Sequence, residues 1–191
     1  ELAEQVAAGE LPEPREIFVA VGSGGTLAGL ALGLRLAGLG SRLVGVLVTD
    51  IVPPRPATLA RAARRSLSLL RRADPTLPEV QVPESAFSLA RDRLGAGYGA
   101  TTPEAEAAVA RAAQVGITLE TTYTGKCLAE ILEREGRGSL AEGPILFWNT
   151  HNAVDVSRTA PYPASVERLP RSIARLLAVD AEAPVASGPA R

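Results

Sequence analysis

The sequence is poor in the residues that build metal sites, disulfide frameworks and catalytic triads. Cys127 is the single cysteine and His151 the single histidine. One cysteine cannot form a disulfide within the chain and has no second thiolate with which to hold a metal ion. One histidine argues against an imidazole-based metal site and against a histidine-dependent triad. We therefore expect no metal, and Lys126, the only lysine beside nineteen arginines, limits amine chemistry to one side chain.

Other absences restrict partners and location. A formal net charge of -1 argues against nucleic acid as a main partner, because the phosphate backbone needs a basic surface. No apolar run approaches the roughly 20 residues of a spanning helix, and no signal peptide is recognisable, so we expect a cytoplasmic protein. Methionine is absent, and residues 1–9 resemble the last turns of a helix already under way. We expect the chain to be the C-terminal part of a longer protein.

The residues that are present follow the pattern of an α/β domain. Apolar residues make up 46% of the chain and charged residues 21%, which suffices for a core. Short continuous apolar runs are typical of strands buried on both faces, and a proline-bounded run is typical of an edge strand. The buried strands are predicted at residues 16–21, 42–50 and 143–150, and the edge strand at 78–85.

Helices are predicted between these strands. Helical spacing and breaker residues place them at 26–38, 57–73, 103–116 and 126–136, with a short extended piece at 117–125. Thr102 is the predicted N-cap of the third, with Pro103 at its first position. The alternation of strands and helices predicts a parallel open sheet flanked by helices. We expect residues 1–160 to form this domain, and 161–191 to form a helix near 166–178 and a disordered tail.

A glycine cluster joins the first strand to the first long helix, in "VAVGSGGTLAGL" (residues 19–30). Its backbone N–H groups and the positive end of the helix could bind an anion without a cationic side chain. A Walker A loop is excluded, because Leu27 and Ala28 stand where Lys and Ser or Thr belong. Three alternatives stay open on the glycines alone: a turn that merely packs, a site for one phosphate, and a dinucleotide site with Leu27 at its last small position.

Polar residues follow other predicted strands and precede helices. "GAGYGATTPE" and "ITLETTYTGKCLAEIL" each place a tyrosine, Tyr98 and Tyr123, in a glycine-flanked turn before a helix, although each could be a packing tyrosine. "FWNTHN" ends an apolar strand in polar residues around Thr150. In open α/β sheets ligands bind beyond the carboxyl ends of the strands, so Thr150 is well placed for a ligand.

Together these segments resemble the fold-type II pyridoxal-phosphate enzymes, which have the tryptophan synthase β-like fold. The resemblance is greatest to the branch that holds 1-aminocyclopropane-1-carboxylate (ACC) deaminase and D-cysteine desulfhydrase. "VGSGGTLAGL" resembles the phosphate loop of that family, "GAGYG" and "TTYTGKCLAEI" its two tyrosine segments, and "ILFWNTHN" its terminal strand. The likeness covers about residues 1–157, the C-terminal part of the cofactor-binding domain.

The resemblance implies a role for each matching residue. Tyr98 and Tyr123 would lie on the substrate side of pyridoxal 5'-phosphate, where a phenol assists proton transfer or binds substrate. Thr150 would lie by the pyridine nitrogen and leave it largely unprotonated, and Thr124 is the other candidate for that place. The phosphate would be bound by backbone N–H groups of the loop, which Gly22 shapes: those of Ser23, Gly24, Gly25 and Thr26.

Three positions depart from the family pattern or limit the chemistry. His151 and Asn152 stand where the family has two glycines, and we interpret His151 as a surface or packing residue, with a new acid/base group as the alternative. The lysine that forms the Schiff base lies in a preceding part of such enzymes, so Lys126 is expected either exposed at a helix start or bonded to a carbonyl. The chain alone is then expected to be inactive.

The resemblance thus implies part of a lyase or deaminase that acts on a small amino acid and releases ammonia and a 2-oxo acid. Homodimers are common in this family, and we expect one here. Two alternatives from other classes remain: an NAD(P)-dependent Rossmann oxidoreductase, and a non-catalytic module that retains the fold.

Overall fold

A computed structural model describes residues 1–152, 154 and 173. The chain divides into two units, Glu1–Asn152 and Ala153–Arg191, and the sheet with its helices belongs to the first. The helix expected near 166–178 and the tail lie outside the described residues, Ile173 excepted. The predicted domain boundary at residue 160 therefore stays a prediction.

Four parallel strands form one sheet in the order β3-β2-β1-β4. β1 lies inside the sheet, with β2 and β4 as its neighbours; Phe18 of β1 is opposite Val44 of β2 and Phe147 of β4. All six residues of β1 are buried, as predicted for a strand covered on both faces. The strands span Glu16–Val21 (β1), Arg42–Leu47 (β2), Phe87–Ala90 (β3) and Ile145–Trp148 (β4).

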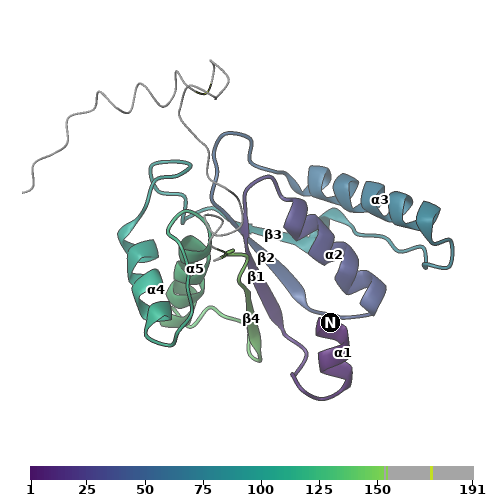
Figure 1. The fold of residues 1–191 in the computed structure, drawn as a ribbon, viewed down its shortest axis with the longest axis horizontal. Coiled ribbons are helices and arrows are strands. Elements are labelled where there is room, and N and C mark those ends of the chain that lie inside the picture. The colour runs from purple at the N-terminus through teal and green to yellow at the C-terminus, as the bar shows by residue number, and fades with distance from the viewer. Residues whose placement is uncertain (153, 155–172, 174–191) are drawn as a thin grey trace, which may run out of the picture. The chain divides into compact units, whose positions relative to one another are not determined.

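Helices cover both faces of the sheet, which confirms the predicted α/β architecture (Figure 1). α2 and α3 lie on one face, and α4 and α5 on the other. The helices span Leu2–Ala7 (α1), Gly25–Ala37 (α2), Pro56–Ala73 (α3), Pro103–Ala113 (α4) and Thr124–Gly136 (α5). Four of them agree closely with the predicted helices, and the Thr102 hydroxyl accepts the Ala105 N–H at 3.2 Å, as an N-cap does.

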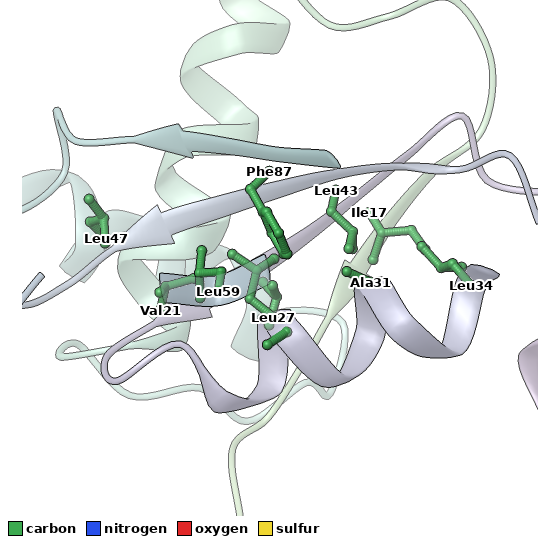
Figure 2. Packing of buried hydrophobic residues seen from close by; sticks show 11 residues of the cluster. Ile17, Val21, Leu27, Ala31, Leu34, Leu43, Leu47, Leu59 and Phe87 are labelled. Atoms are coloured by element: carbon green, nitrogen blue, oxygen red, sulfur yellow. The ribbon is translucent and has the colours of Figure 1, made fainter. Parts of the chain in front are cut away.

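Alternate residues of the strands build two separate cores. Ile17, Val19 and Val21 of β1 pack with Leu27 of α2 and Leu59 of α3 on one face, as part of the cluster that Figure 2 shows. On the other face the strand residues meet Cys127 of α5, in the cluster Phe18, Ala20, Val44, Val46, Val48, Ala90 and Cys127. The period-2 alternation of a strand therefore holds helices on both faces.

Three sequence predictions are corrected. The short edge strand is β3, at Phe87–Ala90 and not at 78–85, although it does lie at the sheet edge. Pro78 and Pro83 lack an N–H for a ladder, and Val80 and Val82 instead pack beside α2 and α3. β4 is half-buried rather than buried, because it pairs only with β1 among the described strands. Residues 117–123 are turn and loop, and α5 already begins at Thr124.

Among the described residues, no helix is both long and apolar enough to cross a membrane. The same residues contain no group of three or more His, Cys, Asp or Glu side chains that could hold a metal ion.

Gly45 of β2 lies where three side chains leave no room for another carbon. A Cβ there would lie 2.7 Å from Leu27 Cδ2 and 2.8 Å from Val21 Cγ2. We expect Gly45→Ala to lower the free energy of unfolding by about 1–3 kcal/mol through overpacking. Gly33→Ala, at an exposed position of α2 with nothing within 4 Å, is the control and should be stabilising by about 0.5–1 kcal/mol. Urea unfolding measures both; equal effects would contradict the packing described.

Candidate functional site

The glycine loop leaves the carboxyl end of β1, at the centre of the sheet. Gly24 has φ +90°, and a Cβ on it would lie 2.5 Å from Leu59 Cδ2. Only glycine fits this left-handed position against α3. The tight turn brings the chain directly into α2, whose first residue is Gly25.

The start of α2 has the properties of an anion site. Its first turn has no side-chain cap and no acidic residue. The N–H groups of a first helical turn have no partner within the helix, and the helix dipole favours negative charge there. Ser23, Gly25 and Thr26 are exposed, whereas Gly24 is buried against Leu59. The chemistry of this donor set fits a phosphate group.

The two predicted tyrosines meet beside this loop. The hydroxyl oxygens of Tyr98 and Tyr123 are 2.7 Å apart, and the rings pack edge to face with centroids at 6.0 Å. A Cβ on Gly22 would lie 3.3 Å from Cε1 and 3.6 Å from the hydroxyl oxygen of Tyr123. The glycine loop and Tyr123, which are about a hundred residues apart in the sequence, thus lie side by side.

The Tyr98 loop is held by an acid that follows β2. Asp50 Oδ1 accepts the Tyr98 backbone N–H at 3.0 Å. A Cβ on Gly97, which has φ +134°, would lie 3.1 Å from Asp50 Oδ2, so the loop backbone approaches this carboxylate closely. The Asp50 carboxylate thus holds the backbone of the Tyr98 loop.

Tyr123 is held by a carboxylate that the sequence reasoning missed. Glu120 accepts the backbone N–H groups of Thr122 (2.7 Å), Tyr123 (2.9 Å) and Thr124 (2.7 Å), and so caps α5. Burial opposes ionisation of Glu120, but these hydrogen bonds outweigh it and hold the pKa of the carboxyl below its usual value. The signal was an acid three residues before the predicted tyrosine, at a helix start.

The two threonines proposed for the pyridine nitrogen differ in their surroundings. Thr124 is buried, and its hydroxyl bonds to the Glu120 backbone N–H (3.1 Å) and carboxylate (3.1 Å). Thr150 is exposed and lies two residues beyond β4, the neighbour of β1. This arrangement favours Thr150 over Thr124 for contact with a ligand. The half-buried His151 donates its backbone N–H to Asn149 Oδ1 at 3.0 Å.

Lys126 is not exposed at the helix start, so that alternative is wrong, and the expected carbonyl contact is present. Its side chain is completely buried, and Nζ donates to the Leu94 carbonyl oxygen at 2.7 Å. Burial lowers the pKa of this amine, while the nearby carboxylates of Glu120 and Asp50 act in the opposite direction. The Lys126 ammonium group therefore connects α5 to the loop that carries Tyr98.

The environment of Tyr123 favours the protonated form of its phenol. The hydrogen bond to Tyr98 raises the pKa of Tyr123, and burial and the charge of Glu120 act in the same direction. A phenol in this environment is protonated at neutral pH and available as a proton donor.

Residues 1–151 match the family of proteins described as pyridoxal-phosphate dependent enzymes. The chain belongs to this family. It is 37% identical over 146 residues to a D-cysteine desulfhydrase of Klebsiella pneumoniae strain 342, and 35% identical over 142 residues to that of strain MGH 78578. These matches cover 74% and 72% of the chain but only 41% and 40% of the relatives. The chain thus spans about two fifths of the relatives' length.

A solved structure gives the same result for the fold. The crystal structure of an ACC deaminase homologue matches with a TM-score of 0.60 at 30% identity, over 76% of the chain and 42% of that protein. The expected fold-type II branch of pyridoxal-phosphate enzymes is thereby confirmed. The nicotinamide oxidoreductase alternative is set aside, because the family match is to pyridoxal-phosphate enzymes.

Tyr98→Phe tests the hydrogen bond between the two tyrosine hydroxyl groups. Removing the hydroxyl deletes the main cause of the raised pKa of Tyr123, so we expect this pKa to fall toward its ordinary value. Carbon NMR of isotope-labelled tyrosine rings measures it directly, and Tyr123→Phe assigns the signal. An unchanged pKa of Tyr123 would show that the hydroxyl pair does not form.

Glu120→Gln tests the cap of α5. A carboxylate whose pKa is lowered by folding contributes stability above its unfolded pKa of about 4.5, and this contribution is lost as pH falls through the folded pKa. We expect a loss of about 1 kcal/mol at neutral pH, small because the group is partly exposed. Urea unfolding at neutral and acidic pH should show the two proteins converging in acid, and a constant difference would refute this account.

Proposed function

We propose that this chain supplies the phosphate loop and the tyrosine pair of a pyridoxal-phosphate-dependent lyase or deaminase. The substrate is a small amino acid, as the names of the D-cysteine desulfhydrase relatives and of the ACC deaminase homologue indicate. The products are ammonia and a 2-oxo acid. The observation that carries the proposal is the close approach of Tyr123 to Gly22, since it joins an anion site to two hydrogen-bonded phenols.

The residues of the glycine loop fit the phosphate of the cofactor. The donors are the backbone N–H groups of Ser23, Gly24, Gly25 and Thr26, and Gly22 gives the Tyr123 ring room to approach. Thr150 is the proposed partner of the pyridine nitrogen. When bound, pyridoxal phosphate supplies an electron sink for carbanion chemistry.

The chain's own residues would then direct the proton transfers. Tyr98 and Tyr123 share a hydrogen bond, so either hydroxyl can hold a proton for the substrate while the other stabilises it. The exposed Tyr98 ring presents the outer hydroxyl to a substrate, and the less exposed Tyr123 lies against the loop.

Lys126 is not the lysine that the cofactor bonds under this proposal. Its Nζ is buried and occupied by Leu94 O, and a nucleophilic amine must reach the cofactor aldehyde. The bonded lysine would then lie outside these 191 residues, and the chain alone would be inactive. The proposal also includes a homodimer, a cytoplasmic location and no nucleic-acid partner.

The test uses the natural protein that contains these residues, purified from cells. After borohydride reduction with pyridoxal phosphate, peptide mass spectrometry should find the cofactor on a lysine other than Lys126. With D-cysteine or ACC, ammonia and a 2-oxo acid should be released in equal amounts, and sulfide with D-cysteine alone. Cofactor bonded to Lys126, or no cofactor and no turnover, would refute the proposal; the latter result fits a non-catalytic module.

Gly24→Ala tests the loop itself. Alanine in a left-handed conformation costs about 1–2 kcal/mol, and its methyl group would displace Leu59. We expect pyridoxal phosphate to bind on the order of tenfold more weakly, measured by absorbance titration. Gly29→Ala is the matched control on α2, with nothing within 4 Å of its Cβ, and should bind normally. Equal affinity in both variants would place the phosphate elsewhere.

A further inference from the structure

The loop that carries Tyr98 is attached to α5 at two points one helical turn apart. Lys126 Nζ donates to the Leu94 carbonyl oxygen at 2.7 Å. Glu130, four residues further along the same helix, forms an ion pair with Arg93 Nε at 3.2 Å. Residues four apart lie on one face of a helix, so this face of α5 contacts two consecutive loop residues, Arg93 and Leu94.

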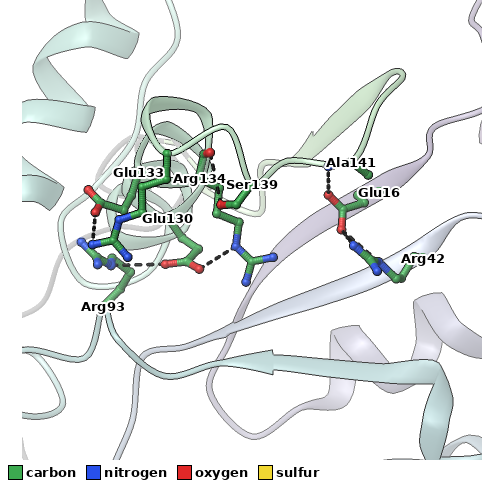
Figure 3. Close-up of polar contacts among 9 residues, drawn as sticks. Glu16, Arg42, Arg93, Glu130, Glu133, Arg134, Ser139 and Ala141 are labelled. Carbon is green, nitrogen blue, oxygen red and sulfur yellow. Dashed lines mark hydrogen bonds and ion pairs between the residues drawn. The ribbon is translucent and has the colours of Figure 1, made fainter.

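Both attachments are buried. The Lys126 side chain is completely buried, Glu130 is 5% exposed, and the Arg93 side chain is 13% exposed. Figure 3 shows Glu130 between Arg93 and Arg134, and the second arginine binds its other carboxylate oxygen at 2.8 Å. A buried hydrogen bond at Leu94 and a buried ion pair at Arg93 therefore attach the loop to α5.

The same helix carries the other phenol, because Tyr123 is the N-cap residue of α5. We infer that Lys126 and Glu130 are positioning residues, which hold the Tyr98 loop on α5 so that the Tyr98 hydroxyl meets that of Tyr123. This inference rests on the proposed function only in assigning the phenols to the reaction. The geometry itself, one helix that holds both partners of a 2.7 Å hydrogen bond, stands without it.

The attachments restrict a loop that is rich in glycine. Gly95, Gly97 and Gly99 around Tyr98 all have positive φ, and glycine loses more conformational freedom on ordering than any other residue. Asp50 holds the tip of the loop through the Tyr98 N–H. Lys126 and Glu130 hold its beginning, where the chain leaves β3.

The decisive measurement is the pKa of Tyr123 in Lys126→Met, determined by carbon NMR of labelled tyrosine rings. The groups that act on Tyr123 are Tyr98 and Glu120. If Lys126 acts through Tyr98, this pKa should fall toward the value in Tyr98→Phe, and adding Lys126→Met to Tyr98→Phe should change nothing further. An unchanged pKa of Tyr123 in the single variant, or additive shifts in the double variant, would overturn the inference.

A control on the same helix separates positioning from loss of stability. Cys127 is buried in the core cluster on which Tyr123 also packs, and among the described residues its side chain makes no hydrogen bond or ion pair with the loop. Cys127→Ala should lower the unfolding temperature but shift the pKa of Tyr123 much less than Lys126→Met does. If it shifts this pKa as much as Lys126→Met does, a general loosening of α5 explains both and the inference fails.

Two further measurements keep the test decisive. If Lys126→Met does not fold, Arg93→Gln removes the second attachment and should shift the pKa of Tyr123 in the same direction, with Arg93→Lys restoring part of the shift. In the enzyme with pyridoxal phosphate bound, we expect Tyr98→Phe to lower kcat about a hundredfold. Lys126→Met should lower kcat by no more than this and should leave KM little changed. A shifted pKa without lyase activity in the parent protein would refute the proposed function and leave the inference intact.

Discussion

β1 has a parallel partner on each side, and helices cover both of its faces. Because the strands are parallel, their carboxyl ends meet at one edge of the sheet. The glycine loop follows β1, Asp50 follows β2, and Thr150 follows β4 at this edge. These segments therefore meet beside the carboxyl end of β1. The residues of this strand are apolar except for Glu16, which lies at its other end.

The polar framework of the site is built from carboxylates that accept backbone N–H groups. Glu120 receives three of them at the start of α5, and Asp50 receives that of Tyr98. These bonds fix main-chain positions, so the side chains of Tyr98 and Tyr123 need few contacts of their own to be oriented. The carboxylates thus hold the backbone, and the neutral hydroxyl groups of the two tyrosines bond to each other.

The sequence was sufficient for elements that local chemistry decides. The apolar run of β1, the glycines at 22, 24 and 25 and the Thr102 cap are evident in short stretches and agree with the structure. β3 was misplaced, because the choice between 78–85 and Phe87–Ala90 depends on pairing with β2 and not on local propensity.

The contacts around the tyrosines could not be predicted from short stretches of the sequence. Asp50 meets Tyr98 across 48 positions of the chain, and Lys126 meets Leu94 across 32. A lysine is almost never fully buried unless it has a partner, so an exposed Lys126 was a reasonable expectation. Only the tertiary arrangement supplies the carbonyl that makes its burial tolerable.

The position of the single tryptophan has a practical consequence. Trp148 is the last residue of β4, opposite Val19 of β1, and is half-buried two residues before Thr150. Indole emission responds to the polarity around the ring and is quenched by energy transfer to a nearby chromophore. The strand that leads to Thr150 thus contains a built-in optical reporter, and occupancy of this edge of the sheet can be followed by intrinsic fluorescence without any label.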